Sequence, residues 1–222
     1  MLVDSEVISC RVHADVLTRH GYPITADQVR ERFLGKSARD AHREVERELG
    51  HALSADFEQQ RSVELLEALA QAVEGVPFIH DALDKLSVQS CVASSGAHEK
   101  IFTTLSRAGL YERFTPHIFS ATQVARGKPA PDLFLFAARE MGVPPEKCLV
   151  VEDSMSGVAA AVAAGMATAG YVGGSHCVSG DAERLLAAGA ILTMKDIREL
   201  PALLRTWNSQ TAAASRADTS VH

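Results

Sequence analysis

The first third of the chain repeats apolar residues at helical spacing. In residues 5–20 valine, isoleucine and leucine recur every three or four positions, and the same spacing returns in residues 54–72. The Thr-Ala-Asp-Gln sequence at residues 25–28 is a capping box, which marks the start of a helix. We find no alternating pattern of the kind that strands show. The pattern therefore predicts a bundle of about four helices over residues 5–72.

From residue 76 onward, short apolar segments alternate with helical ones. Apolar strands that alternate with helices imply a parallel sheet covered on both faces. The small polar residues at the end of the chain predict a disordered tail over residues 206–222. The expected strands are residues 88–94, 117–121, 148–152, 167–172 and 190–192, and the expected helices are residues 98–109, 131–141, 156–165, 181–189 and 196–204.

Composition and charge exclude several classes of protein. Of the 222 residues 46% are apolar and 23% are charged, which is ordinary globular composition and excludes a disordered or fibrous chain. The net charge of −6 argues against a nucleic-acid partner, and no apolar run is long enough to span a bilayer. The four cysteines form no CxxC pair and the N-terminus does not resemble a signal peptide, so we expect a cytoplasmic protein with reduced thiols.

Hydroxyl groups stand at the end of the first expected strand. Ser94 and Ser95 lie there, followed by Gly96 and a helix. A hydroxyl and free backbone N–H groups at the start of a helix can bind an anion such as phosphate. A serine in this position is also an ordinary helix cap, so on its own the pattern leaves both interpretations open.

A lysine lies in a loop that two prolines stiffen. Lys128 precedes Pro129 and Pro131, just before a helix begins. A rigidly held ammonium group is well suited to binding a phosphate as a point charge. The alternative is a solvated loop lysine, which is what most lysines are. The two prolines favour a binding role.

Two adjacent carboxylates follow the most apolar of the expected strands. Glu152 and Asp153 come at the end of residues 148–152, and Ser154 follows. Two carboxylates at the mouth of a buried strand are costly unless a cation compensates them. Mg²⁺ bound by one or two carboxylates together with a phosphate meets that need. The alternative is that Asp153 caps the next helix, and we favour the metal.

These three features, in this order, resemble the haloacid dehalogenase superfamily of phosphatases and phosphomutases. The segments VASSG, GKPAPD and VVEDSMSGVAAAVAAGM carry the resemblance, which extends to about residue 204. It implies an α/β fold with a Rossmann-like doubly wound parallel sheet, formed by residues 1–4 and 73–205. Residues 5–72 resemble the inserted helical cap of the β-phosphoglucomutase-like branch.

The resemblance also implies roles for the candidate residues. Ser94, with Ser95 beside it, would bind the transferring phosphoryl group, and Lys128 would steady the phosphate and the nucleophile. Glu152 and Asp153 would hold Mg²⁺. The reaction would be hydrolysis of a phosphate ester through an aspartyl-phosphate.

One part of the family pattern does not appear in this sequence. The family begins with a strand followed by Asp-x-Asp-Gly-x-x-x-Asp, in which the first Asp is the nucleophile and the second is the general acid and base. Asp4 and Ser5 match the end of that motif, so both catalytic aspartates and their strand would fall before Met1. In the family that strand lies between the strand ending at Ser94 and the one ending at Glu152.

Three explanations of this difference remain open. The first is that the start codon was assigned too late. The second is that the chain is a truncated pseudoenzyme, and the third is that the sheet closes around the gap. We expect no phosphate release from the chain as written. Two strands without their common neighbour would leave unpaired backbone groups, at a cost of about 1–3 kcal/mol each when buried.

The sequence indicates the substrate less clearly than the reaction. Small phosphorylated sugars or sugar acids are the class that the resemblance favours, with Lys36, Ser37 and Arg39 matching the specificity loop of the cap. Lys36 and Arg39 could bind a second anionic group, or they could be solvated charges at helix ends. Ser9 stands where the sugar mutases carry a histidine, which favours a phosphatase over a mutase. A non-catalytic protein that binds a phosphorylated ligand is the alternative from another class, and the oligomeric state stays open.

Overall fold

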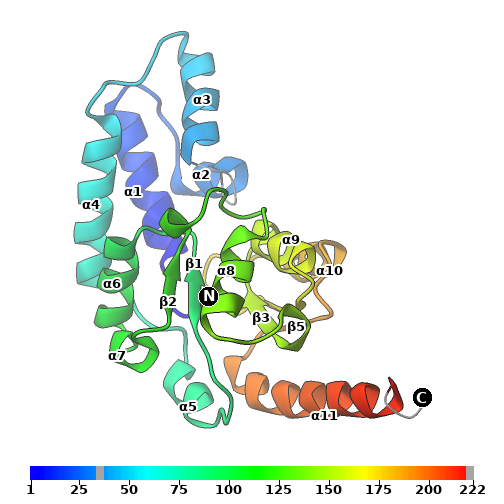
Figure 1. Ribbon diagram of the computed structural model, residues 1–222. Helices are drawn as coiled ribbons and strands as arrows, with labels where there is room; N and C mark the ends of the chain where they lie inside the picture. Colours follow the sequence, from blue (N-terminus) through cyan, green and yellow to red (C-terminus); the bar gives the residue numbers. More distant parts are fainter. Residues whose placement is uncertain (34–37, 219–222) are drawn as a thin grey trace.

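The computed structural model describes residues 1–33 and 38–218. It has a helical lobe and an α/β lobe (Figure 1). The helices of the first lobe lie where the apolar spacing predicts them, and no strand is assigned among its described residues. They are α1 (Glu6–Arg19), α2 (Ala26–Phe33), α3 (Ala38–Leu49) and α4 (Phe57–Ala72).

The helical lobe has a hydrophobic core of its own. Its centre is formed by Val16 and Leu17 of α1, Val45 of α3, and Phe57 and Leu69 of α4, each at most 2% exposed. Burial of large apolar side chains is worth about 1.5–3 kcal/mol for each of them. The apolar stripes recognised in the sequence are thus the faces that hold these helices together.

The capping box expected at the start of α2 is present. The hydroxyl of Thr25 accepts a hydrogen bond from the backbone N–H of Gln28 at 3.2 Å, and the Thr25 N–H donates to the Gln28 side chain at 2.9 Å. These two bonds satisfy groups that a helix end leaves without partners. They fix where the second helix of the bundle begins.

A buried histidine makes the stability of the helical lobe depend on pH. The Nε2 atom of His13 is buried without a hydrogen-bond partner among the described residues. Burial, with the charges of Arg61 and His42, lowers the pKa of His13 to about 4, although Glu58 acts in the opposite direction. Between pH 6.5 and 4 the unfolded chain therefore binds more protons than the folded one. The free energy of unfolding should fall by about 3 kcal/mol as the pH decreases through this range.

Urea unfolding at pH 7.5 and at pH 5 would measure about 2 kcal/mol of this loss, since pH 5 lies within the range over which the loss develops. His13→Gln should reduce the difference between the two pH values, because glutamine does not titrate. His51→Gln is the matched control, since His51 is exposed in the same lobe. An unchanged pH dependence in His13→Gln would contradict the assignment.

The α/β lobe contains five short parallel strands close to the expected places, although β1 begins four residues and β5 two residues later than expected. Helix α8 packs against β1 and β2, α9 against β3 and β4, and α10 against β4 and β5. The strands are β1 (Val92–Ser94), β2 (Ile118–Ser120), β3 (Leu149–Glu152), β4 (Ala167–Tyr171) and β5 (Leu192–Met194). The helices are α5 (Ile79–Asp84), α6 (His98–Arg107), α7 (Tyr111–Phe114), α8 (Asp132–Glu140), α9 (Met155–Ala163), α10 (Asp181–Ala187) and α11 (Leu200–Asp218), with 3-10 turns at Ala121–Gln123, Pro145–Lys147 and Ile197–Glu199.

The strands form two sheets, which differs from the single sheet expected. One sheet pairs β1 with β2, and the other has the order β3-β4-β5. All three pairings are parallel, with Ala93 opposite Phe119 and Val151 opposite Ala169. The break falls between β1 and β3, where the family resemblance places a further strand. The two strands do not close up to pair with each other.

Residues 1–4 connect the two lobes. Val3 forms an antiparallel bridge with Gly75, and the N–H of Val76 donates to the carbonyl of Leu2 at 3.1 Å. The side chains of Met1 and Leu2 pack against the core of the α/β lobe. This short segment therefore leads from the break between the sheets directly into α1.

The C-terminal helix is longer than the sequence pattern suggests. Helix α11 continues to Asp218, across most of the segment for which composition predicts disorder. The alanine-rich sequence there has a high helix propensity, which explains the difference. Helices α5 and α7 were also not expected, because each has six or fewer residues and too few positions to show a period.

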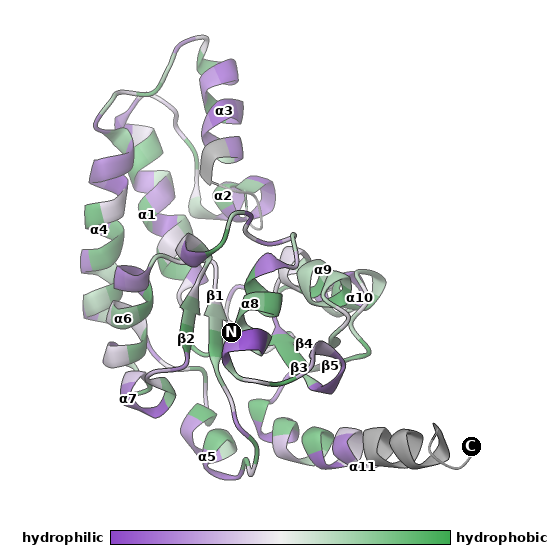
Figure 2. Ribbon diagram, in the orientation of Figure 1, coloured by the Kyte–Doolittle hydropathy of each residue, from purple (hydrophilic) through white to green (hydrophobic). Residues whose placement is uncertain are grey.

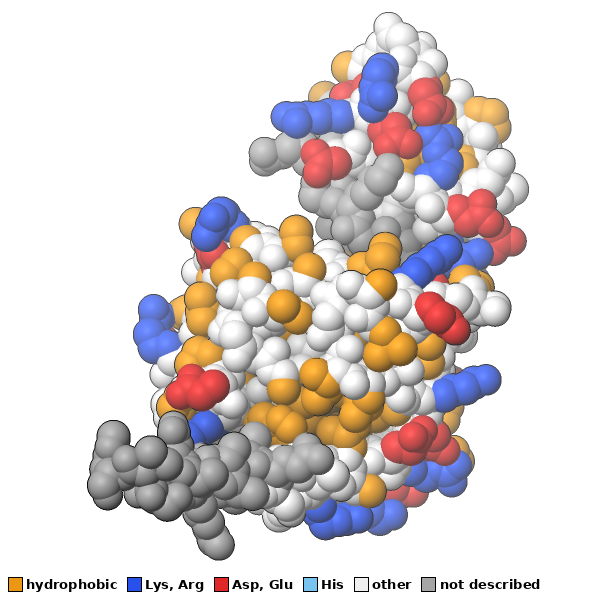
Figure 3. Space-filling model, turned by 90° about the vertical axis from the view of Figure 1, so that its right-hand side faces the viewer, with side chains coloured by type: hydrophobic (Ala, Val, Ile, Leu, Met, Phe, Trp, Pro, Cys, Tyr) orange, Lys and Arg blue, Asp and Glu red, His pale blue; other side chains and the backbone are white. Residues whose placement is uncertain are grey.

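Hydropathy differs between the helices of the two lobes. Helix α9, with the sequence MSGVAAAVA, is apolar along most of its length, whereas α3 is largely hydrophilic (Figure 2). On the face that Figure 3 shows, Lys and Arg side chains are interspersed with Asp and Glu. Among the described residues no helix combines the length and the apolar character that crossing a membrane requires.

Candidate active site

Lys128 connects the two sheets. Its Nζ donates a hydrogen bond to the carbonyl of Ala93 in β1 at 3.1 Å and forms an ion pair with Oε1 of Glu152 in β3. The side chain is only 7% exposed, and Nζ lies 4.6 Å from the centre of the Phe134 ring. These three contacts place the ammonium group between the carboxyl ends of β1 and β3.

Glu152 is held by donors on both of its oxygens. Oε1 faces Lys128, and Oε2 accepts hydrogen bonds from the Asp153 N–H, the Ser154 N–H and the Ser154 hydroxyl at 3.0–3.2 Å. A Cβ at Gly157 would overlap this carboxyl group. The first turn of α9 is thus shaped around Glu152.

Asp153 presents its carboxylate to a cation. Its Oδ2 lies 3.0 Å from the amino group of Met1. Burial acts to raise the pKa of Asp153, but the positively charged Met1 amine, with the nearby His176 ring, outweighs it and holds the pKa below its usual value. The N-cap of α9 is Ser154, whose hydroxyl accepts from the Gly157 N–H at 3.1 Å, so Asp153 does not serve as the cap.

The two serines at the end of β1 differ in their surroundings. The hydroxyl of Ser94 accepts a hydrogen bond from the Gly96 N–H at 3.1 Å, whereas Ser95 is exposed. Ala97 occupies the N-cap of α6, and no side chain caps that end. Ser94 thus lines the site without acting as a helix cap.

The structure adds two residues to the site: Asp4, which the sequence matched to the end of the family motif without giving it a role, and His176, which the sequence did not single out. Both oxygens of Asp4 accept from the Ser175 N–H, at 3.3 and 3.2 Å. The ring of His176 lies between two carboxylates, with Nδ1 4.0 Å from Asp4 and Nε2 3.9 Å from Asp153. His176 follows β4, so the rule that sites gather at the carboxyl ends of parallel strands was the signal that would have found it.

Most of these groups line one large cavity. It has a volume of about 1720 Å³, and its lining includes Ser94, Lys128, Asp153 and His176 from the α/β lobe. On the side of the helical lobe its lining includes Arg30 and Arg61. Lys36 and Ser37 lie outside the described residues, as does the side chain of Arg39, so the expected specificity loop has no structural account.

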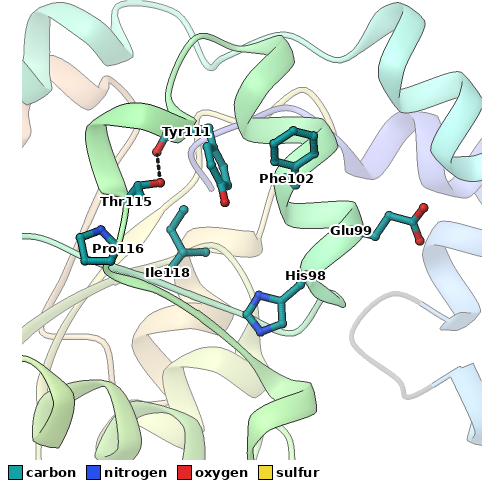
Figure 4. A pocket seen from close by; sticks show the side chains of 7 residues that line it. All are labelled: His98, Glu99, Phe102, Tyr111, Thr115, Pro116 and Ile118. Carbon is teal, nitrogen blue, oxygen red and sulfur yellow. Dashed lines mark hydrogen bonds between the residues drawn. The ribbon is translucent and has the colours of Figure 1, made fainter.

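A second, smaller cavity contains none of the expected site residues. Its volume is about 500 Å³, and it lies between α6, α7 and β2. Phe102 and Tyr111 meet edge to face there at 4.9 Å, and the Thr115 hydroxyl donates to the Tyr111 carbonyl at 3.1 Å (Figure 4). The larger cavity is therefore the candidate active site.

The donor set of the larger cavity is compatible with Mg²⁺ only in part. Asp153 offers a carboxylate that already faces a cationic group, and hard oxygen donors are the ligands that Mg²⁺ prefers. Glu152 is occupied by Lys128 and three donors, so it can position Asp153 more readily than bind a metal itself. Among the described residues, no group of three or more His, Cys, Asp or Glu side chains is arranged so that it could hold a metal ion.

The family model and the curated relatives that match this chain indicate the same class of enzyme. A family model for haloacid dehalogenase-like hydrolases matches residues 7–165. A phosphorylated carbohydrates phosphatase of Thermotoga maritima is 30% identical over 203 residues, covering 88% of this chain and 90% of the relative. The 6-phosphogluconate phosphatase of Escherichia coli is 28% identical over 166 residues, covering 74% of this chain and 75% of the relative.

A solved structure is similar over nearly the whole chain. A haloacid dehalogenase-like protein of unknown function from Agrobacterium tumefaciens superposes with a TM-score of 0.83 at 36% identity. The match covers 93% of this chain and 94% of that protein.

Proposed function

This chain belongs to the haloacid dehalogenase-like hydrolase family, and we propose that its site is that of a Mg²⁺-dependent phosphatase for small phosphorylated metabolites, sugar phosphates above all. The observation that carries the proposal is the position of Lys128, which joins the carboxyl ends of β1 and β3 beside Ser94 and Asp153. A cation, a hydroxyl and a carboxylate gathered at strand ends suit a metal-bound phosphate. Two relatives that are named as phosphatases of phosphorylated sugars support this substrate class.

Each residue has a distinct role in the proposed site. The hydroxyl of Ser94 donates to a phosphoryl oxygen, with Ser95 at the rim, and the ammonium group of Lys128 neutralises the charge that grows on the phosphoryl group. Asp153 would hold Mg²⁺ with Glu152 behind it, and the metal would supply further charge stabilisation. The helical lobe over residues 5–72 acts as the cap and selects the leaving group.

We propose that the chain as it stands binds phosphate without hydrolysing it. Three described carboxylates near Lys128 are engaged by other groups: Glu152 by Lys128, Asp153 by the Met1 amine, and Asp4 by the Ser175 N–H. None of them is free to attack phosphorus. The break between β1 and β3 also favours a non-catalytic phosphate-binding protein as the second candidate.

Calorimetric titration with Mg²⁺ and inorganic phosphate tests the proposal. We expect Asp153→Asn to weaken Mg²⁺ binding at least about tenfold, because it removes the ligand charge. Asp84→Asn is the control, since Asp84 is an exposed carboxylate that pairs with Arg113 outside the site. Absence of both Mg²⁺ and phosphate binding would contradict the function. Mg²⁺-dependent phosphate release that Lys128→Ala abolishes would contradict the expected lack of turnover.

A further inference from the structure

Two basic side chains in the lining of the larger cavity have no strong ion-pair partner. Arg30 of α2 is 22% exposed, and its ion pair is with Glu31, at 3.9 Å, whose side chain is 67% exposed. A pair of that kind contributes little in water. Lys100 of α6 is half-buried, and among the described residues no carboxylate forms an ion pair with it. Both cations therefore keep their charge available for a ligand.

Most other charged side chains of the lining have partners within it. Glu6, at the start of α1, is a carboxylate of the lining that accepts a hydrogen bond from the Ser5 hydroxyl at 3.5 Å. The part of the cavity around Arg30 and Lys100 thus offers two cations and one further acceptor. The pairs within the lining are Lys128 with Glu152, Arg61 with Glu58, and Arg184 with Asp181.

Lys100 lies beside a serine of the candidate active site. A Cβ at Gly96 would meet the Cδ of Lys100 and the hydroxyl of Ser94, each at 3.4 Å. Helix α6, which carries Lys100, packs against α4 of the helical lobe (Figure 1). The Lys100 side chain therefore stands between the phosphate-binding end of β1 and the helical lobe.

The two cations come from different lobes but surround the same buried residue. Cys10 of α1 is 7% exposed. Burial raises the pKa of its thiol to about 11, and Glu6 adds to this effect, whereas Arg30 and Lys100 both act to lower it. Because the interaction between charges falls with distance, all three charged groups lie near Cys10. Arg30 and Lys100 therefore face the cavity together, at the boundary between the lobes.

We propose that Arg30 and Lys100 form a second anion subsite, which binds a carboxylate or phosphate group at the end of the substrate opposite the transferred phosphoryl group. The inference rests on the proposed function, since the first phosphate at Ser94 fixes the other end of the ligand. Arg30 offers a planar fork of donors and Lys100 a point charge, and both suit either anion. Glu6 can accept a hydrogen bond from a sugar hydroxyl. The substrate class is thereby narrowed to phosphorylated sugars with two anionic ends.

Calorimetric titration with matched ligands, in the presence of Mg²⁺, tests the subsite on the chain as it stands. D-Gluconate 6-phosphate and D-glucitol 6-phosphate differ only in a carboxylate in place of a hydroxymethyl group. D-Glucitol 1,6-bisphosphate carries a second phosphate at that end. We expect at least one of the two doubly anionic ligands to bind at least about tenfold more tightly than D-glucitol 6-phosphate, and the tighter one identifies the terminal group. Equal binding of all three would overturn the proposal.

Charge-removing variants assign the preference to the two side chains. Arg30→Gln and Lys100→Gln should each reduce it at least about threefold, and comparing ligands within one variant cancels any change in stability. Arg11→Gln and Lys85→Gln should keep it, since both residues are exposed and lie outside the cavity lining. A preference that persists in both test variants would overturn the proposal. So would a Lys100→Gln variant that binds inorganic phosphate as poorly as the doubly anionic ligand, because Lys100 would then belong to the first phosphate site.

Inorganic phosphate and D-gluconate, added separately, distinguish this inference from the proposed function. If phosphate binds but the three sugar phosphates bind equally, the proposed function holds and the second subsite fails. If phosphate does not bind, but D-gluconate binds and Arg30→Gln weakens it at least about threefold, the second subsite holds and the phosphate site fails. Binding of neither would overturn both.

Discussion

Gly157→Ala is expected to destabilise the α/β lobe by about 3 kcal/mol and to weaken phosphate and Mg²⁺ binding at least about tenfold. A Cβ at this position would overlap the carboxyl group of Glu152, which lies beneath the first turn of α9. The carboxylate cannot move aside without leaving Lys128 and its three donors on Asp153 and Ser154. The substitution therefore destabilises the lobe in two ways, by steric strain and by disrupting the ion pair between Glu152 and Lys128.

Urea unfolding and calorimetric titration with inorganic phosphate would measure both effects. Gly127→Ala is the matched control for stability, because a Cβ there would meet only the Ala121 side chain, at an ordinary 3.9 Å. If Gly157→Ala unfolds at the same urea concentration as the parent chain, then the close fit between α9 and Glu152 is not required.

Lys128→Met is expected to cost about 3–5 kcal/mol of stability, because it leaves the Glu152 carboxylate buried without its cation. The Glu152 side chain is only 10% exposed, so water does not readily replace the ammonium group. The substitution also removes the donor to the Ala93 carbonyl, and with it the connection between the two sheets. Phosphate binding should weaken at least about tenfold, since the substitution removes the cation that lies beside Ser94 and Asp153.

A double-mutant cycle distinguishes the ion pair from a general loss of packing. Lys128→Met combined with Glu152→Gln should be less destabilising than the sum of the single changes, by about 1–3 kcal/mol. Lys147→Met replaces an exposed lysine and should have little effect on stability. Additive single and double changes would show that the two side chains do not depend on each other.

Much of the fold could be predicted because its elements depend on local patterns. The Thr25 capping box and the apolar stripes predicted the helical lobe, and five apolar segments predicted the five strands. Elements with too few residues for a period, such as α5 and α7, were missed. The extension of α11 to Asp218 was also missed, because a composition of small polar residues was given more weight than the helix propensity of its alanines.

The candidate site was predictable where its residues follow strands in the sequence. Ser94, Lys128, Glu152 and Asp153 were found in this way, and the structure brings them to one cavity. The place of Asp4 in the site was not predicted, and His176 was not singled out. They are 172 positions apart in the chain, and only the packing of the loop after β4 against the N-terminal segment brings them together.

The sequence by itself determined the α/β class, the helical lobe, the five strands and the residue types of the candidate site, because each depends on periodicity or on a short motif. Only the tertiary structure decided which of the charged groups pair with each other. It placed Lys128 on Glu152, left Asp153 facing the Met1 amine, and held β1 and β3 apart. The physical reason is that ion pairs and strand pairing depend on distances between segments remote in the chain, which local patterns do not contain.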